Sequence, residues 1–457
     1  MDNTLGKTNF TEGRILSPLI KFALPVLLSL LLQSLYSAVD LLIVGKFAGT
    51  ADVSGVSTGG QFMYIMLSLL GGYAVAITVL MGQKLGEGDN AGVEKTLSAG
   101  IYFFAVSGIV ITAAVVIFTD PIVKLMNAPE EAYSATFNYI RICGWGSVFI
   151  FAYNLIGSIF RGLGDAKTPL VTVSIACVVN IFGDLYMVRT LGMGAAGAAI
   201  ATVGAQFISV VLSLIFISRK KLLPFFSFKK LSPDRSYIRR IIKIGTPISL
   251  QDVLVSVSFA VILVIVNSMG LIASAGMGVG EKLCSFIMLL PSACSQAMAA
   301  FVSQNAGAGK HERADKALKY MILCSLGASV ILFWASFFHG DILSSIFTNE
   351  PEVIAAAADY LKAYAIDCLL TSFLFCFLGY YSGYARSTFV MLQGIFGAFC
   401  VRIPVAFIMS RSANPSLFKV GLSTPCSSVV QVILCLVYMR SMRKKLTLCE
   451  DMNISAD

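Results

Sequence analysis

Gln83-Lys-Leu-Gly-Glu-Gly88 follows one long apolar stretch of the 457-residue chain, and Gln304-Asn-Ala-Gly-Ala-Gly309 follows another, 221 residues later. Each is followed at the same spacing by a lysine and a leucine, in Lys95-Thr-Leu97 and in Lys316-Ala-Leu318. Two apolar helices can resemble each other by chance. Chance rarely produces several polar residues and glycines that recur at the same sequence offset. The sequence therefore indicates an internal repeat.

Other landmarks extend the repeat along the chain. Leu-Ile-Lys-Phe-Ala-Leu-Pro25 pairs with Ile-Ile-Lys-Ile-Gly-Thr-Pro247 at an offset of 222, and the offset of 221 relates Tyr139 to Tyr360 and Gly162 to Gly383. We predict a cytoplasmic amino end (1–16), a first six-helix bundle (17–217), a basic linker (218–239), a second six-helix bundle (240–440) and a cytoplasmic tail (441–457).

The composition is that of a membrane protein. Hydrophobic residues make up 57% of the chain and charged residues 13%, with a mean hydropathy of +0.81. Soluble domains carry about 25% charged residues. Apolar runs of about 20 residues, the length that crosses a bilayer, predict helices at 17–44, 53–81, 94–118, 134–160, 168–189, 194–217, 240–266, 276–303, 316–338, 354–381, 388–409 and 418–440. The predicted fold class is an all-α membrane protein with a parallel pseudo-two-fold repeat.

The distribution of positive charge predicts the orientation. If the amino terminus is cytoplasmic, the cytoplasmic segments and the helix ends beside them hold 25 of the 34 Lys and Arg residues, and the outward loops hold 5. This asymmetry follows the positive-inside rule. We therefore expect both termini in the cytoplasm of a cell (inner) membrane protein, and the net charge of +9 does not indicate a nucleic-acid partner.

The cysteines and histidines do not form a recognisable site. The 11 cysteines include no C-x-x-C pair, and ten of them fall within or beside apolar spans. Buried free thiols that pack as small hydrophobic groups are the simpler interpretation. With only 2 histidines, a zinc site is not expected. We also find no Ser-His-Asp set and no P-loop, so an enzyme is not expected.

Acidic residues inside apolar spans are the strongest functional signal. Ionisable residues are costly in a bilayer and normally face a cavity or a partner. Gln33, Tyr36 and Asp40 share one face of the first span, and Asn180 and Asp184 share one face of the fifth. The two aspartates lie at similar depth in the outer half of the membrane.

The repeat makes this acidic pair distinctive. Asp40 corresponds to Ile262 in the second half, while Asn180 and Asp184 correspond to Cys400 and Pro404. A feature present in one half only is not required by the fold. Buried neighbouring carboxyl groups favour the neutral state, so such a pair can take a proton, a sodium ion or an organic cation.

The second half and the prolines add further candidates. Asp252, Glu281 and Asp367 are predicted to line a substrate pocket together with Gln33, and Arg402 is a candidate partner for one of these acids. Pro25, Pro247, Pro291 and Pro404 each remove a helical hydrogen bond. Pro25 is the predicted hinge because it shares its helix with Asp40.

At these residues the chain resembles the multidrug and toxic compound extrusion (MATE) family over roughly residues 15–440. The motifs that carry the resemblance are, in chain order, Phe-Ala-Leu-Pro25, Gln33 with Asp40-Leu-Leu-Ile-Val-Gly45, Gly82-Gln83-x-x-Gly86, Arg161-Gly162-x-Gly164-Asp165-x-Lys167-Thr168-Pro169, Asn180-x-x-x-Asp184, and Ser303-Gln304-x-x-Gly307-Ala308-Gly309.

The resemblance implies two six-helix bundles that export organic, cationic and amphipathic compounds in exchange for inward Na⁺ or H⁺. It assigns coupling-ion binding to Asp40, Asn180 and Asp184, with Tyr36, Asn154 and Thr202 as neighbours. Some members carry a glutamate in the seventh span, where this chain has Val255 or Ser256. We expect no cofactor besides the coupling ion, and we expect a monomer in contact with lipid and small organic substrates.

Two other kinds of carrier are possible on sequence grounds. A major facilitator would carry Asp-Arg/Lys-x-Gly-Arg after its second span, where this chain has Gln-Lys-Leu-Gly-Glu-Gly-Asp89. A lipid-linked saccharide flippase would need more cationic residues facing its cavity to bind a pyrophosphate. The acidic residues described above suit a cationic substrate better.

The predicted orientation can be tested by labelling. On a cysteine-free background, single cysteines in residues 127–131 should react with a membrane-impermeant thiol reagent in intact cells, because this loop is predicted to face outward. Cysteines in residues 218–243 should react only after the cells are permeabilised. Preferential labelling of residues 218–243 from outside would show that the true orientation is the reverse of the predicted one.

Overall fold

The protein is built from long apolar helices. The computed structural model describes residues 10–219 and 233–454, and no strand occurs among them. Most of the predicted linker, residues 220–232, lies outside the described residues. Within the described residues, twelve helices are long and apolar enough to span a membrane, as the sequence predicts. Helices suit this environment because every backbone hydrogen bond is made within the segment.

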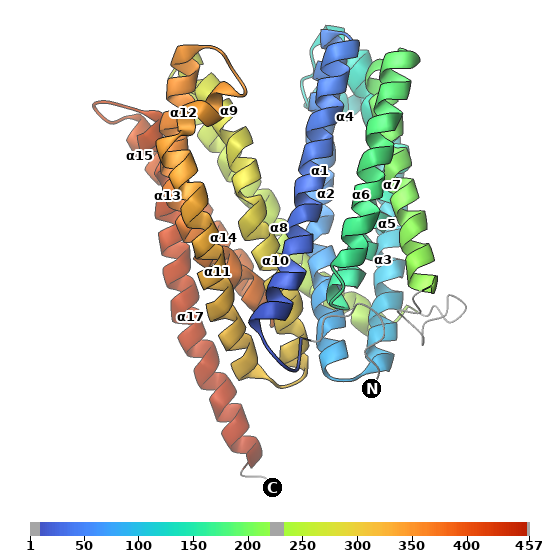
Figure 1. Ribbon diagram of the computed structural model, residues 1–457, viewed down its shortest axis with the longest axis vertical. Helices are drawn as coiled ribbons and strands as arrows, with labels where there is room; N and C mark the ends of the chain where they lie inside the picture. The colour runs from blue at the N-terminus through green and yellow to red at the C-terminus, as the bar shows by residue number, and fades with distance from the viewer. Residues whose placement is uncertain (1–9, 220–232, 455–457) are drawn as a thin grey trace. The chain divides into compact units, whose positions relative to one another are not determined.

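The amino half provides six of the spans. They are α1 (Leu16–Phe47), α2 (Thr50–Gly86), α3 (Asn90–Ile117), α5 (Tyr133–Gly162), α6 (Lys167–Asp184) with its π-helical end η2 (Leu185–Thr190), and α7 (Gly194–Arg219). A short helix, α4 (Thr119–Leu125), and a 3₁₀ turn, η1 (Glu130–Ala132), lie between α3 and α5. The helices of this half run alongside one another in Figure 1.

The carboxy half repeats this order with more interruptions. Its spans are α8 (Arg235–Asn267), α9 (Leu271–Ile287) with α10 (Leu289–Gly307), α11 (His311–Phe338), α13 (Pro351–Gly383), α14 (Ser387–Ile395) with η4 (Phe396–Arg402) and α15 (Ile403–Ser410), and α17 (Ser423–Ile454). The short helices are α12 (Gly340–Ser345) and α16 (Leu417–Gly421). Pro291 lies just after the break between α9 and α10, and Pro404 begins α15, whereas Pro25 and Pro247 lie inside α1 and α8.

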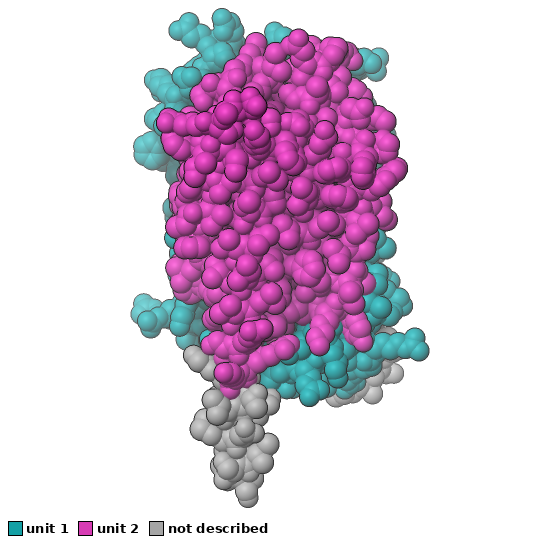
Figure 2. All heavy atoms as spheres, turned by 90° about the vertical axis from the view of Figure 1, so that its left-hand side faces the viewer, with its two compact units in different colours: residues 1–250, 296–317, 382–387 teal, residues 251–295, 318–381, 388–457 magenta. Residues whose placement is uncertain are grey.

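The chain divides into two compact units, coloured separately in Figure 2. Unit 1 comprises residues 1–250, 296–317 and 382–387, and unit 2 comprises residues 251–295, 318–381 and 388–457. Unit 1 therefore contains the whole amino half together with one end of α10, the start of α11 and the turn after α13. The predicted boundaries at 217 and 240 rest on the sequence alone and stay a prediction.

Glycines let the second span of each half pack closely on the fourth. In unit 1, a Cβ atom added to Gly55 would lie 2.7 Å from the Cβ of Ala135. In unit 2, a Cβ added to Gly276 would lie 2.6 Å from the Cβ of Ala356. Both residues of the second pair lie 221 positions after those of the first. The two halves thus use the same small-residue contact, a common device between membrane helices.

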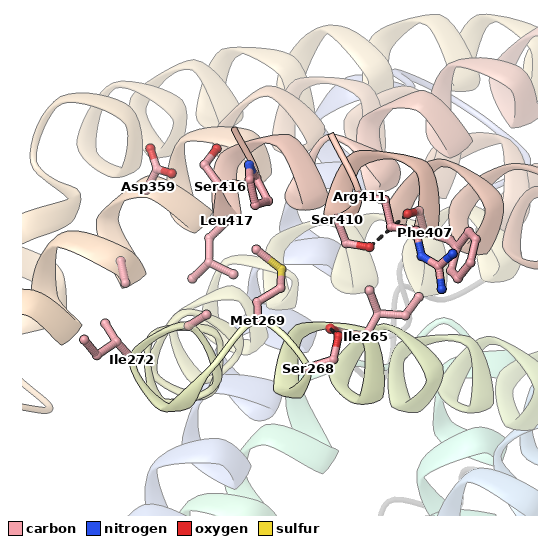
Figure 3. Close-up of a pocket in the computed structure, with 13 residues that line it drawn as sticks. Ile265, Ser268, Met269, Ile272, Asp359, Phe407, Ser410, Arg411, Ser416 and Leu417 are labelled. Carbon is pink, nitrogen blue, oxygen red and sulfur yellow. Dashed lines mark hydrogen bonds between the residues drawn. The ribbon is translucent and has the colours of Figure 1, made fainter. Parts of the chain in front are cut away.

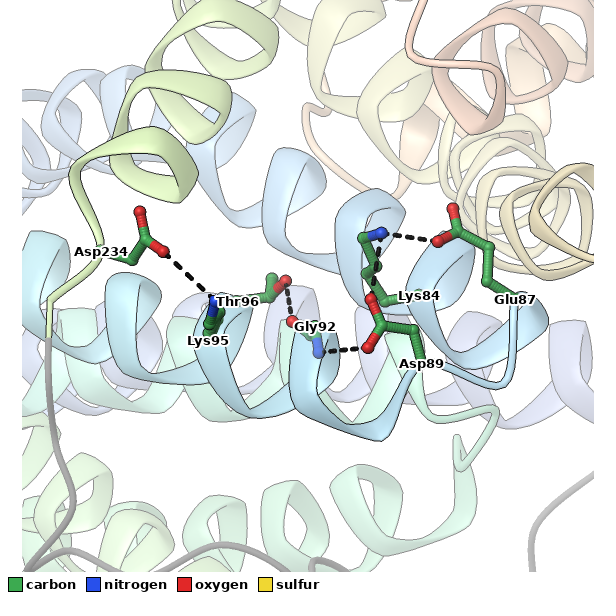
Figure 4. Close-up of polar contacts among 7 residues, drawn as sticks. All are labelled: Lys84, Glu87, Asp89, Gly92, Lys95, Thr96 and Asp234. Carbon is green, nitrogen blue, oxygen red and sulfur yellow. Dashed lines mark hydrogen bonds and ion pairs between the residues drawn. The ribbon is translucent and has the colours of Figure 1, made fainter.

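The loop between α2 and α3 is held by charged groups (Figure 4). The Nζ of Lys84 lies 2.6 Å from Glu87 Oε2 and 3.2 Å from Asp89 Oδ2. Asp89 also caps α3, because its Oδ1 accepts a hydrogen bond of 2.8 Å from the Gly92 N–H. That backbone bond and the nearby Lys84 ammonium lower the pKa of Asp89. Lys95 pairs with Asp234 at 3.7 Å.

The segment before α1 is attached to the start of α11 within unit 1. Phe10 is fully buried, with its ring 5.2 Å from that of Phe22 and 5.1 Å from that of Phe301. Asn305 Nδ2 and Arg313 Nε both donate hydrogen bonds to the carbonyl of Phe10, at 3.1 and 2.8 Å. Arg313 also donates to three backbone carbonyls between residues 12 and 14.

The glycine contacts predict a stability effect. Gly55→Ala and Gly276→Ala should each lower stability by about 1–3 kcal/mol, because the new methyl group would meet backbone atoms that cannot move aside. Thermal unfolding of the purified protein in detergent measures this. Gly60→Ala and Gly278→Ala are matched controls in the same helices, since an added Cβ there has no heavy atom within 4 Å. An equal loss in the controls would contradict the packing argument.

Candidate functional site

Two carboxyl groups are buried together in unit 1. Asp40 lies on α1 with 5% of its surface exposed, and Asp184 ends α6 with 0% exposed. Asn180, one turn before Asp184 on α6, is 1% exposed. Helices α1 and α6 pack against each other, and this packing brings the three side chains to one place.

Hydrogen bonds connect the acidic pair to α7. Thr202 Oγ1 donates to Asp40 Oδ2 at 3.2 Å, and Asn180 Nδ2 lies 3.5 Å from the same hydroxyl oxygen, which is a long hydrogen bond. The carboxyl of Asp40 also interacts directly with the side chains of Asp184 and Asn180. Four of the residues predicted to bind the coupling ion therefore lie in one cluster, contributed by three helices.

The cluster has more acceptors than donors. Asp40 Oδ1, Asn180 Oδ1 and both carboxyl oxygens of Asp184 are buried, and none receives a hydrogen bond from a described residue. Two ionised carboxylates in contact would repel each other and would lack solvation. The arrangement therefore calls for a proton shared between the carboxyls or for a small cation among their oxygens.

Two further polar contacts lie along α1 on the same helical face. Gln206 Nε2, on α7, approaches the hydroxyl of Tyr36 at 3.4 Å, and Gln33 Nε2 donates to the hydroxyl of Tyr153 on α5 at 3.1 Å. Gln206 is buried, and sequence reasoning missed it. Its signal was an amide in an apolar span, four residues after Thr202 and hence on the same face. We call these contacts, with the acidic cluster, the polar ladder of unit 1.

Asn154 is placed differently from its predicted neighbours. Its Nδ2 donates to the carbonyl of Ile150 in its own helix at 2.8 Å. Among the contacts of the described residues, none joins Asn154 to the acidic pair. Its predicted role in ion binding stays a prediction.

A local change of helix geometry follows Asp184. Residues Leu185–Thr190 form the π-helical segment η2, directly after the last α-helical residue of α6. π-Helical turns occur often at functional sites because they redirect side chains within a helix. In the carboxy half the π-helical segment η4 contains Arg402 instead. Both π-helical segments thus adjoin a buried charged residue.

The second-half candidates do not form an equivalent cluster. Asp367 is buried on α13 near Ser428 of α17, and one of its carboxyl oxygens is unpaired among the described residues. Glu281 lies on α9. Both Glu281 and Asp367 are close enough to Cys284 to act on it electrostatically, so the two acids lie in the same region of unit 2. Asp252 is exposed on α8, and no contact between its carboxyl and these two acids is found among the described residues.

Arg402 makes no ion pair within 4 Å of a carboxylate in the described part of the chain. Its Nη1 donates to Ser258 Oγ at 3.1 Å, and its guanidinium lies 4.4 Å from the ring centroid of Phe259. The guanidinium charge still acts on Asp367 electrostatically. The structure therefore shows no direct pair between Arg402 and a second-half acid, and that pairing stays a prediction.

A cavity of about 550 Å³ lies elsewhere in unit 2 (Figure 3). Ile265, Met269, Asp359, Phe407, Arg411 and Leu417 are among its lining residues. None of the four residues predicted to form the substrate pocket lines it. Asp359 is already engaged, since its Oδ2 accepts a hydrogen bond of 3.0 Å from the Phe418 N–H.

The predicted hinge lies in an uninterrupted helix. Helix α1 runs from Leu16 to Phe47 with Pro25 inside it, and the Ser29 hydroxyl donates to the Pro25 carbonyl at 2.8 Å. A serine bonded to the carbonyl four residues earlier often accompanies a bend. The hinge function of Pro25 stays a prediction.

Several known bacterial proteins resemble this chain over most of its length. The chain is 28% identical to the probable multidrug resistance protein YoeA of Bacillus subtilis (strain 168), over 93% of each chain. It is 27% identical to the probable multidrug resistance protein YpnP of the same organism, over 84% of this chain and 85% of the relative. It is 24% identical to the multidrug export protein MepA of Staphylococcus haemolyticus (strain JCSC1435), over 96% of each.

Solved structures share the fold. One, described as an outward-facing conformation of a multidrug resistance MATE family transporter, matches 98% of this chain with a TM-score of 0.91 and 18% identity, and all of its own chain is covered. Structures of MATE described as straight and bent match with TM-scores of 0.90 and 0.89, also at 18% identity, over 97% and 98% of this chain and 100% and 99% of theirs. At this identity the similarity concerns the fold alone.

The family model settles the family and confirms the repeat. The MatE model matches the chain twice, at residues 25–186 and 247–408, which together make up well over half of the sequence. The second match begins 222 residues after the first, the offset found between Pro25 and Pro247. This chain is a multi-pass membrane protein that belongs to the MatE family of multidrug efflux transporters.

Proposed function

We propose that this protein exports organic, cationic and amphipathic compounds in exchange for inward Na⁺ or H⁺ by alternating access. The coupling ion binds at Asp40 and Asp184, with Asn180 and Thr202 completing the site. The single observation that carries the proposal is the proximity of two buried carboxyl groups, Asp40 and Asp184, of whose four oxygens only Asp40 Oδ2 receives a hydrogen bond from a described residue. Such a site is incomplete without a proton or a cation.

The same site can couple two fluxes. A cation among the carboxyl oxygens of Asp40 and Asp184 neutralises charge that would otherwise need water or a cationic substrate. Binding of one cation therefore disfavours binding of the other, and this linkage is reciprocal. The oxygen-rich donor set, with an amide and a hydroxyl beside the carboxyls, suits a hard ion such as Na⁺ as well as a proton.

The polar ladder supports a pocket in the amino half. Gln33, Tyr36, Tyr153 and Gln206 offer hydroxyl and amide groups next to the acids, and aromatic rings can contact the apolar part of a cation. The positive charge of the loops supports placing the loop after α2 and both termini in the cytoplasm of a cell membrane protein. Export then runs from this basic side to the outer side.

The leading alternative is a lipid-linked saccharide flippase of similar architecture. Such a substrate carries a pyrophosphate, which would be repelled by Asp40 and Asp184 unless both were neutral. An excess of acceptors in the amino-half site therefore favours a cationic substrate over an anionic one.

The proposed site predicts that replacing an acidic residue has different effects in the two halves. Asp40→Asn and Asp184→Asn should each reduce ion-driven export by at least tenfold, because each removes a charge that the ion must neutralise while keeping the side-chain volume. Asp367→Asn should mainly change substrate preference. Export measured in vesicles with separately imposed sodium and pH gradients checks this and distinguishes Na⁺ from H⁺.

Asp120→Asn is the matched control, because Asp120 is a carboxylate outside the spans that pairs with Lys124 at 2.7 Å. Its export should equal that of the unmodified protein. Normal ion-driven export by both Asp40→Asn and Asp184→Asn would place the coupling site elsewhere.

The hinge predicts a kinetic effect at Pro25. Pro25→Ala should restore a helical hydrogen bond, stiffen α1 and slow turnover severalfold, while equilibrium binding of ion and substrate changes much less. Pro25 lies fifteen residues before Asp40, about 22 Å along a straight helix, so it does not touch the ion. Turnover and binding are measured on reconstituted protein, and unchanged turnover would leave Pro25 as a tolerated kink.

A further inference from the structure

Two glutamines form reciprocal hydrogen bonds at one end of unit 1. Gln83 Nε2, near the end of α2, donates to the carbonyl of Gly383 at 3.0 Å. Gln304 Nε2, near the end of α10, donates to the carbonyl of Gly162 at 2.9 Å. The repeat relates the two glutamines to each other and the two glycines to each other, both at an offset of 221. Each half of the sequence thus donates one hydrogen bond to the other, and the repeat relates the two bonds to each other.

The backbones of α2 and α10 also meet at this place. A Cβ atom added to Gly86 would lie 2.0 Å from the carbonyl oxygen of Gln304, and one added to Gly307 would lie 2.0 Å from the carbonyl oxygen of Gln83. Only glycine allows this approach from both sides. We call the four residues Gln83, Gly162, Gln304 and Gly383 the glutamine clasp.

Neighbouring contacts cover the same end. Asn305, next to Gln304, is fully buried and donates to the carbonyl of Phe10. Gln304 itself is only 4% exposed, whereas Gln83 is half-buried. Water is therefore largely excluded from this part of unit 1.

We propose that the glutamine clasp holds the cytoplasmic end of the transporter closed, and that both of its hydrogen bonds break each time this end opens. This inference rests on the alternating access proposed above. In alternating access, an end of the transporter that is closed in one state must open in the other. Contacts that join the two halves at that end must therefore separate. Gln83 and Gln304 are accordingly positioning residues of the transport cycle.

The chemistry of the clasp suits repeated opening. Hydrogen bonds between neutral groups contribute modestly to stability, because water replaces them when the partners separate. An opened end admits water to both amides and both carbonyls, so no polar group remains unpaired. A buried ion pair or a large apolar contact would resist separation much more strongly.

Spin labels at residues 95 and 316 test the proposal in the cysteine-free full-length protein in lipid nanodiscs. These lysines lie near the starts of α3 and α11, are related by the repeat, and have side chains 55% and 61% exposed. Gln83→Met and Gln304→Met remove the donor at similar volume. Each should raise the ratio of long to short inter-label distances about tenfold, the equivalent of about 1.4 kcal/mol.

Gln61→Met is the control, because Gln61 is exposed on the same helix as Gln83 and should leave the distance distribution unchanged. If both clasp variants fold but leave the distances unchanged, or lower only the melting temperature, the glutamines are structural and the proposal is wrong. Gln83→Met carries the test alone if Gln304→Met does not fold, because Gln83 is half-buried. The distances require neither ion gradient nor substrate, so this result is independent of the Asp40 and Asp184 experiments.

Discussion

A polar group in the hydrocarbon core of a membrane has no water to bond, and this cost shapes the whole protein. The backbone largely avoids the cost by forming helices in the twelve spans of the described residues, where N–H groups bond to carbonyls of their own segment. Side chains face the same constraint, so most buried polar groups here donate to a nearby carbonyl or hydroxyl. Asp40, Asn180 and Asp184 stand out because they gather four buried oxygens without a donor among the described residues in one place.

The repeat provides the scaffold, and the residues that differ between its two halves carry the proposed ion site. Both halves pack their second span on their fourth through equivalent glycines, Gly55 and Gly276, so the architecture is duplicated. The acidic pair is not duplicated, because Ile262 and Pro404 stand where the amino half has Asp40 and Asp184. Ile262 is a buried core residue of unit 2. The proposed ion site therefore belongs to one half only, and at one of the equivalent positions the other half packs an apolar side chain.

Helix α5 links the polar ladder to the clasp within unit 1. Tyr153 contacts Gln33 near the acidic cluster, and Gly162 at the end of the same helix accepts the bond from Gln304. Nine residues separate them, about 13 Å of helix. In the proposed transport cycle, a shift of α5 at the polar ladder would be transmitted to the clasp, because a helix moves as a stiff element.

The sequence by itself determined the spans, the repeat and the acidic pair, because hydrophobic length, a fixed offset and helical spacing are local properties. Asp40 and Asp184 could be found as costly charges in apolar spans. Only the tertiary structure decided that Gln206 joins Tyr36, that Asn154 bonds to its own helix, and that equivalent glutamines bond reciprocally to equivalent glycines. These contacts depend on how far each helix is rotated and how closely it packs, and residues far apart in sequence set both.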